Sequence, residues 1–373
     1  MARVISARAR LAARARAEYD FCASRYLQAV VNMITRRQAL RQLSLIASTS
    51  GLPAASGAVA LKLVGILSEA EATRAGVDWE PDFWPVMAQR GWVLGQNIAV
   101  ERAFSNAKSD RLPQLAQELV RKRVDVILCG ANDQQAMVAA ARATRTVPIV
   151  VFDAFDPLEQ GLIDSFARPG RNVTGVALTA GADFDAKRLE YLRAIAPSAK
   201  RLCWLRSSAS PFRSRVDGTS FDTSRSFAAA ANKMGFETRS FQAPRPSDID
   251  QAFTDAMTWG AQAVTVGRAW RLASTRSEVA QLALRHGLPS AFLASGFVQA
   301  GGLLSYAVSD SEFELAALRC IEYVDRVLRG ANPADMPVIG PDRYELTINT
   351  KTAEALGLTI PQSILVRADR LVR

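Results

Sequence analysis

The sequence predicts an α/β fold made of two doubly wound parallel-sheet lobes with a cleft between them. Short apolar runs with the length of buried strands alternate with amphipathic helical segments, first over residues 61–176 and again over residues 185–293. A chain of 373 residues is long enough for two domains of average size. Because each series has crossovers of ordinary length, two lobes are more economical than one very wide sheet.

The first series shows the helical signal most clearly after Asp110. Apolar residues between Leu112 and Val120 recur at helical spacing and form one face. Further helices are expected before residue 90, at 133–144 and at 158–166. The apolar runs predict strands at residues 61–67, 98–103, 124–129 and 147–152.

The second series repeats this alternation. Strands and helices that alternate along the chain form parallel sheets with helices on both faces. The predicted strands are residues 201–205, 236–241, 263–266 and 290–293, and the predicted helices are residues 185–195, 221–234, 249–259 and 278–286.

The positive charge of the chain is concentrated at its beginning. Nine arginines and only two acids lie within residues 1–60, so the rest of the chain contributes only +3 to the total of +10. A nearly neutral body lacks the basic surface that nucleic-acid binding requires. We therefore expect no nucleic-acid partner.

Residues 33–60 have the order of a secretory signal peptide. The pair Arg36 and Arg37 precedes a weakly apolar stretch, and small residues follow at Ala58 and Ala60 as in a cleavage site. The arginine pair resembles a twin-arginine export motif, although Ala39 stands where a phenylalanine is usual. We predict export to the periplasm, cleavage after Ala60 and no lipid anchor. Residues 1–32 do not fit a signal and are interpreted as a non-native or basic extension.

The cysteines and the histidine give no support for catalysis or metal binding. The single histidine, His286, lies in a predicted helix-to-strand turn, which makes a histidine metal site or a Ser-His-Asp triad improbable. No paired carboxylates, phosphate loop or nucleophile elbow is found. We expect no catalytic residues, no metal and no cofactor. The four cysteines, Cys22, Cys129, Cys203 and Cys320, are widely spaced. Removal of the leader leaves the last three, an odd number that cannot fully pair, and these are predicted to be buried free thiols.

Candidate ligand-binding residues lie in the loops that follow the strands. In open parallel sheets, ligands bind beyond the carboxyl ends of the strands. Two such lobes facing each other would line a shared cleft with these loops. The predicted ligand-binding residues are Ser68, Asn132, Asp133 and Asp156 from the first lobe, Trp270 and Ser295 from the second, and Tyr306 beside the hinge.

Structural roles compete with these assignments. Asp156 precedes a proline and could fix its loop as an Asx-turn. Asn132 and Asp133 could serve only as a helix cap. Trp270 and Tyr306 could be packing residues rather than a platform or cap for a ligand.

Several sequence patterns are spaced through residues 61–373. They are residues 95–98 (Gly-Gln-Asn-Ile), 110–119, 156–157 (Asp-Pro), 161–162, 167–175 (Ala-Arg-Pro-Gly-Arg-Asn-Val-Thr-Gly), 301–306 and 349–361. Together these segments resemble the ABC-transporter substrate-binding proteins related to the tryptophan- and tyrosine-binding lipoproteins. Because the patterns are long and well separated, the resemblance does not depend on one short motif.

This resemblance implies a type I periplasmic-binding fold whose chain crosses between the lobes three times. We place the crossings near 175–180, 296–302 and 337–343, which gives a first lobe of 61–176 plus 300–338. The second lobe is then 177–299 plus 339–373. The resemblance also implies a monomer that binds a small molecule and docks, in its closed form, on an inner-membrane ABC permease.

One departure from the family pattern concerns the loop after the third strand. The family has a Gly-Thr or Gly-Ser step there, whereas this chain has Ala131, Asn132 and Asp133. An added acid in a loop that faces the ligand would favour a cationic or hydroxyl-rich ligand over an unmodified amino acid.

Three other functions occur on a body of this kind. A lactose-repressor-type regulator also carries about sixty residues before such a body, but residues 43–60 contain no charge, which does not fit a helix-turn-helix. An enzyme on the same fold lacks a catalytic constellation here. A periplasmic ligand sensor is physically identical to a transport protein, and the sequence leaves that alternative open.

Overall fold

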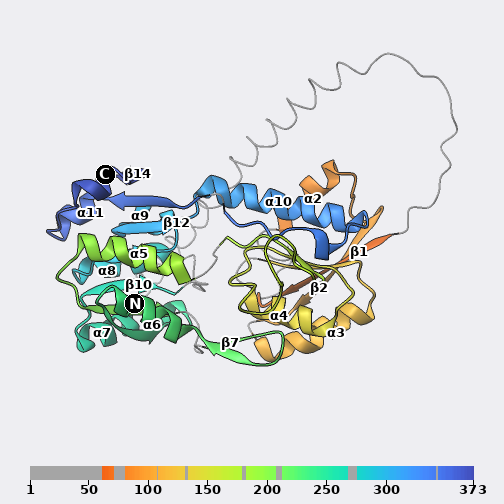
Figure 1. Cartoon of the computed structure of the whole chain (residues 1–373), viewed down its shortest axis with the longest axis horizontal. Helices are drawn as coiled ribbons and strands as arrows, with labels where there is room; N and C mark the ends of the chain where they lie inside the picture. The colour runs from red at the N-terminus through yellow and green to blue at the C-terminus, as the bar shows by residue number, and fades with distance from the viewer. Residues whose placement is uncertain are drawn as a thin grey trace, which may run out of the picture. The chain divides into compact units, whose positions relative to one another are not determined.

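The structure is a computed structural model of the chain (Figure 1). It describes residues 61–70, 80–106, 108–130, 133–178, 182–206, 212–267, 275–341 and 343–373. The chain divides into two units, residues 1–60 and residues 61–373, and all of the described residues belong to the second unit. The predictions for the export motif, the cleavage site, Asn132 and Trp270 lie outside the described residues.

The first lobe is built on a five-stranded parallel sheet in the order β2-β1-β3-β4-β5. Its strands are fully apolar at the centre, where β3 reads Val-Ile-Leu-Cys and is buried throughout. Such continuous burial is typical of a parallel strand covered on both faces. The strands are β1 (Lys62–Ser68), β2 (Ile98–Phe104), β3 (Val126–Cys129), β4 (Ile149–Val151) and β5 (Val173–Gly175).

Two pairs of helices cover the two faces of this sheet. The face under α3 (Leu112–Arg121) and α4 (Gln134–Ala143) forms one buried apolar cluster. The opposite face packs against α2 (Glu80–Gln89) and α10 (Asp310–Leu328), which form a second cluster. Helix α10 therefore belongs to the first lobe although it lies near the end of the chain.

The second lobe contains a seven-stranded sheet in the order β14-β13-β12-β11-β10-β6-β9. All neighbouring strands are parallel except β12 and β13. Its strands are β6 (Arg201–Arg206), β9 (Glu237–Gln242), β10 (Ala263–Val266), β11 (Ser290–Phe292), β12 (Leu304–Ala307), β13 (Glu345–Asn349) and β14 (Arg370–Val372).

The helices of the second lobe also divide between two faces. Helices α5 and α6 contribute to one apolar cluster, and α7 and α8 contribute to the other. The two lobes confirm the predicted fold class. The helices are α5 (Ala182–Ile195), α6 (Thr223–Lys233), α7 (Ile249–Trp259), α8 (Arg276–Arg285), α9 (Ser295–Gln299), α11 (Thr350–Ala355) and α12 (Gln362–Leu365).

The chain passes between the lobes after β5, after β12 and before β13. The predicted second crossing at residues 296–302 is wrong, and so is the predicted start of the returning first-lobe segment at residue 300. Strand β12 pairs with both β11 and β13, for example through Ala291 with Leu304 and through Leu304 with Ile348. These ladder hydrogen bonds keep residues 304–307 in the second sheet, so the chain leaves only after Ala307.

Two elements between the predicted strands also differ from expectation. Residues 158–166, predicted as a helix, form turns. Asp156 and Gly161 have φ angles of 44° and 70°, in the left-handed region that a right-handed helix does not use. A short antiparallel hairpin, β7 (Phe212–Ser214) with β8 (Ser220–Asp222), was not predicted.

The three cysteines in the described part of the chain are confirmed as buried free thiols. They are Cys129, Cys203 and Cys320. Burial raises the pKa of each thiol, and that of Cys320 reaches about 12. Since the thiolate is the reactive form, these side chains behave as small apolar residues.

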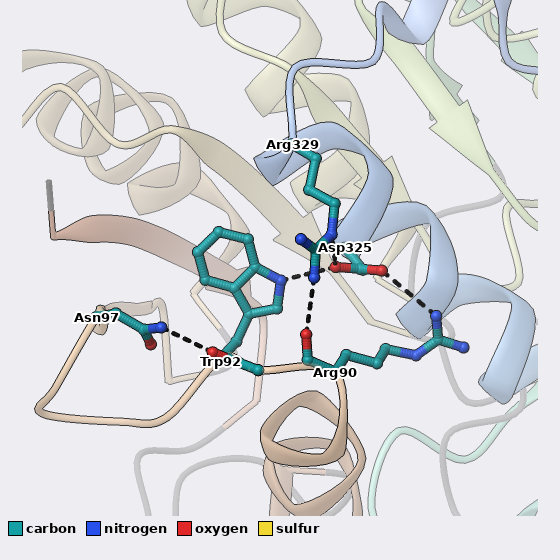
Figure 2. Close-up of polar contacts among 6 residues, drawn as sticks. Arg90, Trp92, Asn97, Asp325 and Arg329 are labelled. Atoms are coloured by element: carbon teal, nitrogen blue, oxygen red, sulfur yellow. Dashed lines mark hydrogen bonds and ion pairs between the residues drawn. The ribbon is translucent and has the colours of Figure 1, made fainter. Parts of the chain in front are cut away.

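A buried carboxylate attaches α10 to the turn after α2 (Figure 2). Asp325 accepts hydrogen bonds from Trp92 Nε1 at 2.7 Å and from Arg329 Nε at 2.7 Å. The Arg90 guanidinium lies 3.4 Å from its other oxygen. The Arg329 guanidinium also donates to the backbone oxygen of Arg90 at 2.7 Å. One carboxylate thus satisfies groups from two segments far apart in sequence.

We predict that Asp325→Asn lowers the free energy of unfolding by about 1–3 kcal/mol at pH 7, because a charge-assisted network is lost. Burial raises the pKa of Asp325, but the hydrogen bonds from Trp92 and Arg329 outweigh burial and hold its pKa below the usual value. The stabilisation is therefore present above the unfolded pKa of about 3.9 and is lost as pH falls through the folded-state pKa.

Urea unfolding at pH 7 and below pH 4 measures this effect. Glu322→Gln on the exposed side of the same helix is the matched control and should change stability little. Equal losses for both variants would contradict the role of the network.

Candidate functional site

The carboxyl ends of the strands form the candidate site, because the strands of the first sheet all run in one direction. Strand β1 pairs with β3 so that Leu67 lies opposite Cys129, and β3 pairs with β4 so that Cys129 lies opposite Val151. The residues that follow these strands therefore collect at one edge. The second sheet has the same arrangement for β6, β10, β11 and β12.

Ser68 and Asp133 are in direct contact at the edge of the first sheet. Ser68 Oγ lies 2.6 Å from Asp133 Oδ2, and the Glu69 amide donates to Asp133 Oδ1 at 3.1 Å. The hydroxyl of Ser109 also donates to the Glu69 carboxylate. Asp133 and Glu69 are 8% and 3% exposed. Asp133 does not use its side chain to cap α4, so the proposed cap role is not what its contacts show.

Burial raises the pKa of Asp133 to about 7, against the lowering effect of the hydrogen bond from Ser68. No basic side chain in the described ranges forms an ion pair with it. An acid buried without a counter-charge favours its neutral form.

The loop after β4 carries two more acids. Gln134, at the start of α4, fixes this loop by donating to the Asp153 carbonyl at 3.1 Å and accepting from the Phe155 amide at 2.9 Å. Asp153 has a φ of 56°, and burial raises its pKa to about 6 although a backbone hydrogen bond from Leu178 lowers it. Asp156 follows as a half-buried residue.

An aromatic pair at the same edge was missed by sequence reasoning. Phe152, directly after β4, is 9% exposed and meets Phe313 at 5.2 Å between ring centroids. Phe313 lies in the first turn of α10 and remains 41% exposed. The cap signature at Ser309, whose hydroxyl accepts from the Glu312 amide, could have placed Phe313 in a helix but not beside Phe152.

The edge of the second sheet carries a buried arginine, which was also not singled out. Arg206 ends β6 and is 6% exposed, with its guanidinium 5.0 Å from the Trp204 ring centroid. Trp204 stacks on Phe227 at 4.5 Å. A Cβ at Gly267 would lie 3.2 Å from Trp204 Nε1, so this end of β10 leaves room for little more than glycine.

Ser295 begins α9 directly beyond β11 and is half-buried. Arg276 reaches the same turn, since a Cβ at Gly296 would lie 3.2 Å from its Nη1. The second lobe therefore places two guanidinium groups at its carboxyl edge.

Tyr306 lies in an aromatic cluster beside the crossings. Its ring centroid is 6.0 Å from Phe184, 5.5 Å from Tyr191 and 5.5 Å from Tyr344. The Tyr344 hydroxyl donates to the Leu178 carbonyl at 3.1 Å, which joins the first and third passages of the chain. The Tyr306 ring therefore packs mainly against other aromatic side chains.

The structure thus brings Ser68 and Asp133 together and places Asp156 on the same edge. Ser295 lies at the edge of the second sheet, and Tyr306 lies beside the crossings. Their roles in ligand binding stay predictions. The described residues contain no group of three or more His, Cys, Asp and Glu side chains suited to a metal ion. No helix among them is long and apolar enough to cross a membrane.

Comparisons with known proteins agree with this architecture. Residues 87–372 match the sequence model of the family described as ABC transporter substrate binding protein. The chain is 26% identical over 278 residues to the tyrosine-binding protein of Clostridioides difficile strain R20291, which covers 74% of this chain and 75% of that protein. The resemblance noted in the sequence is confirmed.

Two solved structures share the fold. The ABC domain from Streptococcus pneumonia in complex with L-Trp is 25% identical with a TM-score of 0.64, and the match covers 84% of this chain and 100% of that chain. A conserved domain protein from Vibrio cholerae is 21% identical with a TM-score of 0.63, covering 84% of this chain and 99% of that one. The family match favours a transport-type binding protein over a regulator.

We predict that Asp133→Asn removes a pH dependence of stability. Because the pKa of Asp133 is raised, the folded protein binds a proton more tightly than the unfolded chain between about pH 4 and pH 7. As pH rises from about 4 to about 7, the free energy of unfolding of the unmodified protein should therefore fall by up to about 4 kcal/mol relative to that of the variant. Asparagine keeps the acceptor for the Glu69 amide.

Urea unfolding between pH 4 and pH 8 measures the difference between the two proteins. Asp110→Asn removes an exposed carboxylate of the same lobe and serves as the control. A difference that does not change with pH would show that Asp133 is not the titrating group.

Proposed function

Because the chain belongs to the ABC transporter substrate-binding protein family and is a solute-binding component for a small ligand, we propose that its ligand is zwitterionic and aromatic. An α-amino acid with an aromatic side chain has the required groups. This differs from the expectation drawn from the added acid alone, because Arg206 and Arg276 offer partners for the ligand carboxylate. The observation that carries this proposal is that carboxyl groups collect at the edge of the first sheet and guanidinium groups at the edge of the second.

The first lobe supplies acids and the second supplies arginines. Glu69, Asp133 and Asp153 lie at the edge of the first sheet, and burial raises the pKa of the two aspartates. Arg206 and Arg276 lie at the edge of the second sheet. A ligand ammonium group would be stabilised by the acids, and a ligand carboxylate would pair with a guanidinium group. Such a ligand binds best when both lobes contact it, which favours closure about the hinge.

The aromatic part of the ligand has a partner in Phe313. Its ring is held by Phe152 and leaves 41% of the residue exposed at the edge where the acids lie. Aromatic rings stack with offset or edge-to-face geometry and gain about 0.5–1.5 kcal/mol beyond the area they bury. Two relatives support this class, since one is called a tyrosine-binding protein and the other was solved with L-Trp.

Membership of the family also supports a role in uptake. Substrate-binding proteins of ABC transporters act outside the cytoplasm. We propose that this chain is exported to the periplasm as a monomer without a lipid anchor and that its closed form docks on an inner-membrane permease.

We expect L-tryptophan or L-tyrosine to raise the melting temperature. At about 100 times its dissociation constant a ligand adds roughly 2.7 kcal/mol of stability, which corresponds to at least ~2 °C for a protein of this size. Thermal shift measurements with both amino acids, and with benzoate and a neutral sugar for comparison, test the ligand class. A shift with the sugar alone would overturn the aromatic zwitterion.

Phe313→Ala should remove most of the ligand-induced shift, and so should Asp156→Ala. Leu315→Ala is the matched control for the aromatic residue, because it lies on the same helix with the same 41% exposure. Asp164→Ala is the control for the acid, since Asp164 is an exposed residue of the same loop. Normal binding by both test variants would assign these residues to packing.

We also predict that the mature protein begins at Leu61, within a few residues. The arginine pair at Arg36 and Arg37 and the small residues Ala58 and Ala60 support this start. N-terminal sequencing of periplasmic protein from the native host checks it, with Arg36→Lys/Arg37→Lys expected to block a twin-arginine route. An intact cytoplasmic chain that retains residues 34–60 would contradict export.

A further inference from the structure

The hairpin formed by β7 and β8 belongs to the second lobe by its place in the chain. It follows β6, and β8 ends at Asp222, directly before α6 begins at Thr223. Its turn is closed by the Arg215 amide, which donates to the Thr219 carbonyl at 2.8 Å. The Asp217 carboxylate also accepts from the amide and hydroxyl of Thr219 at 2.9 and 2.7 Å. The turn therefore has a defined conformation.

One residue of the hairpin turn, Val216, is buried against the first lobe, whereas residues 217–220 of the same turn are exposed. Val216 is 7% exposed and is part of the apolar cluster beneath α3 and α4. Its amide donates to the Gln160 carbonyl at 2.9 Å, and its carbonyl accepts from Arg142 Nε at 3.3 Å. Both backbone groups of one second-lobe residue are thus satisfied by first-lobe residues, and β7 lies beside α4 (Figure 1).

Arginine side chains reinforce this contact in both directions. Arg142 of α4 also donates to the carbonyl of Arg215. Arg215 donates to the Glu159 carbonyl at 2.9 Å and forms an ion pair with the Glu159 carboxylate. The Glu159 and Gln160 carbonyls, which a helix over 158–166 would have used internally, are therefore bonded by the hairpin.

The contact reaches the loop that contains Asp156. The Gln160 amide donates to the Asp156 carbonyl at 3.0 Å, and the Leu162 amide donates to the Pro157 carbonyl at 2.9 Å. The residue that receives the hairpin tip is thus one turn away from a predicted ligand-binding residue.

We propose that this hairpin is a strap that restrains the separation of the two lobes and positions the Asp156 loop. The strap is a fourth link beside the three covalent passages. The hairpin follows β6, whereas the chain passes to the first lobe after β12. Strands β10 and β11 lie between these two strands, so the hairpin starts three strand spacings, or about 14 Å, from that passage. A rotation of roughly 20° about the passages would move the strap by about 5 Å, more than its hydrogen bonds can follow.

The strap therefore opposes wide opening of the ligand-free protein. The ligand-free state is the one to test, so the result does not depend on the ligand class proposed above. If the amino-acid ligands fail while the strap behaves as described, only the proposed ligand class is lost.

Arg142→Ala is the test variant, because Arg142 is an exposed side chain whose donors hold the hairpin tip. Hydrogen exchange of peptides covering residues 212–222 should speed up at least about tenfold at the Val216 amide, since the tip undocks more often. The radius of gyration from small-angle scattering of the ligand-free protein should rise. Arg142→Lys, which keeps a cationic donor, should restore most of both properties.

Arg145→Ala is the matched control, because it removes another exposed arginine only three residues away. It should leave exchange and the radius of gyration unchanged. Unchanged exchange in Arg142→Ala would show that Arg142 does not hold the tip and would overturn the proposal. Faster exchange with an unchanged radius of gyration would show that the strap does not restrain the lobes, which would overturn it as well.

Discussion

The common direction of the parallel strands is the constraint on which the rest of this structure depends. Backbone ladders hold β1, β3 and β4 so that each ends at one edge, and the chain leaves β5 and β12 from that same kind of edge to enter the other lobe. The passages and the polar loops therefore share a location. A change in the angle between the lobes must alter the surroundings of the loops that follow the strands, which is why hinge motion and ligand capture are coupled in this architecture.

Burial of charge at these edges adds a second constraint. Asp133 bonds to Ser68 and to the Glu69 amide, and burial raises its pKa in spite of the hydrogen bond from Ser68. A protein usually avoids such an arrangement unless a partner supplies the missing charge. The carboxylate of Asp325 shows the contrast, because Trp92 and two arginines surround it and its pKa is lowered. Asp325 joins α10 to the turn after α2, whereas Asp133 has no basic partner among the residues that the structure describes.

Local sequence predicted the elements whose stability is local. The apolar runs of β1 and β3 and the helical face after Leu112 follow from periodicity alone, and they place Ser68 and Asp133 after strands. The errors arise where distant residues decide the structure. The loop at 158–166 has helix-compatible sequence, but the carbonyls of Glu159 and Gln160 bond to residues 56 positions later in the chain, Arg215 and Val216. Strand β12 belongs to the second lobe because it pairs with β11 on one side and β13 on the other. The local sequence around residue 304 does not show this, because β13 lies much later in the chain. Phe313 becomes a candidate site residue only because the fold places it beside Phe152.

The hairpin of β7 and β8 links the movement of the lobes to the conformation of a loop at the candidate site. An α/β lobe normally satisfies the loop carbonyls after its strands from within the same lobe, and here Glu159 and Gln160 are bonded from the other lobe. The Asp156 loop therefore has its conformation set partly by the second lobe, before any ligand arrives. Such pre-organisation lowers the entropy lost when a ligand orders the loop, but it also limits how far the lobes can part to admit one. The weak geometry of the Arg142 bond to Val216, at 3.3 Å, is consistent with a contact that can be released more readily than a covalent passage.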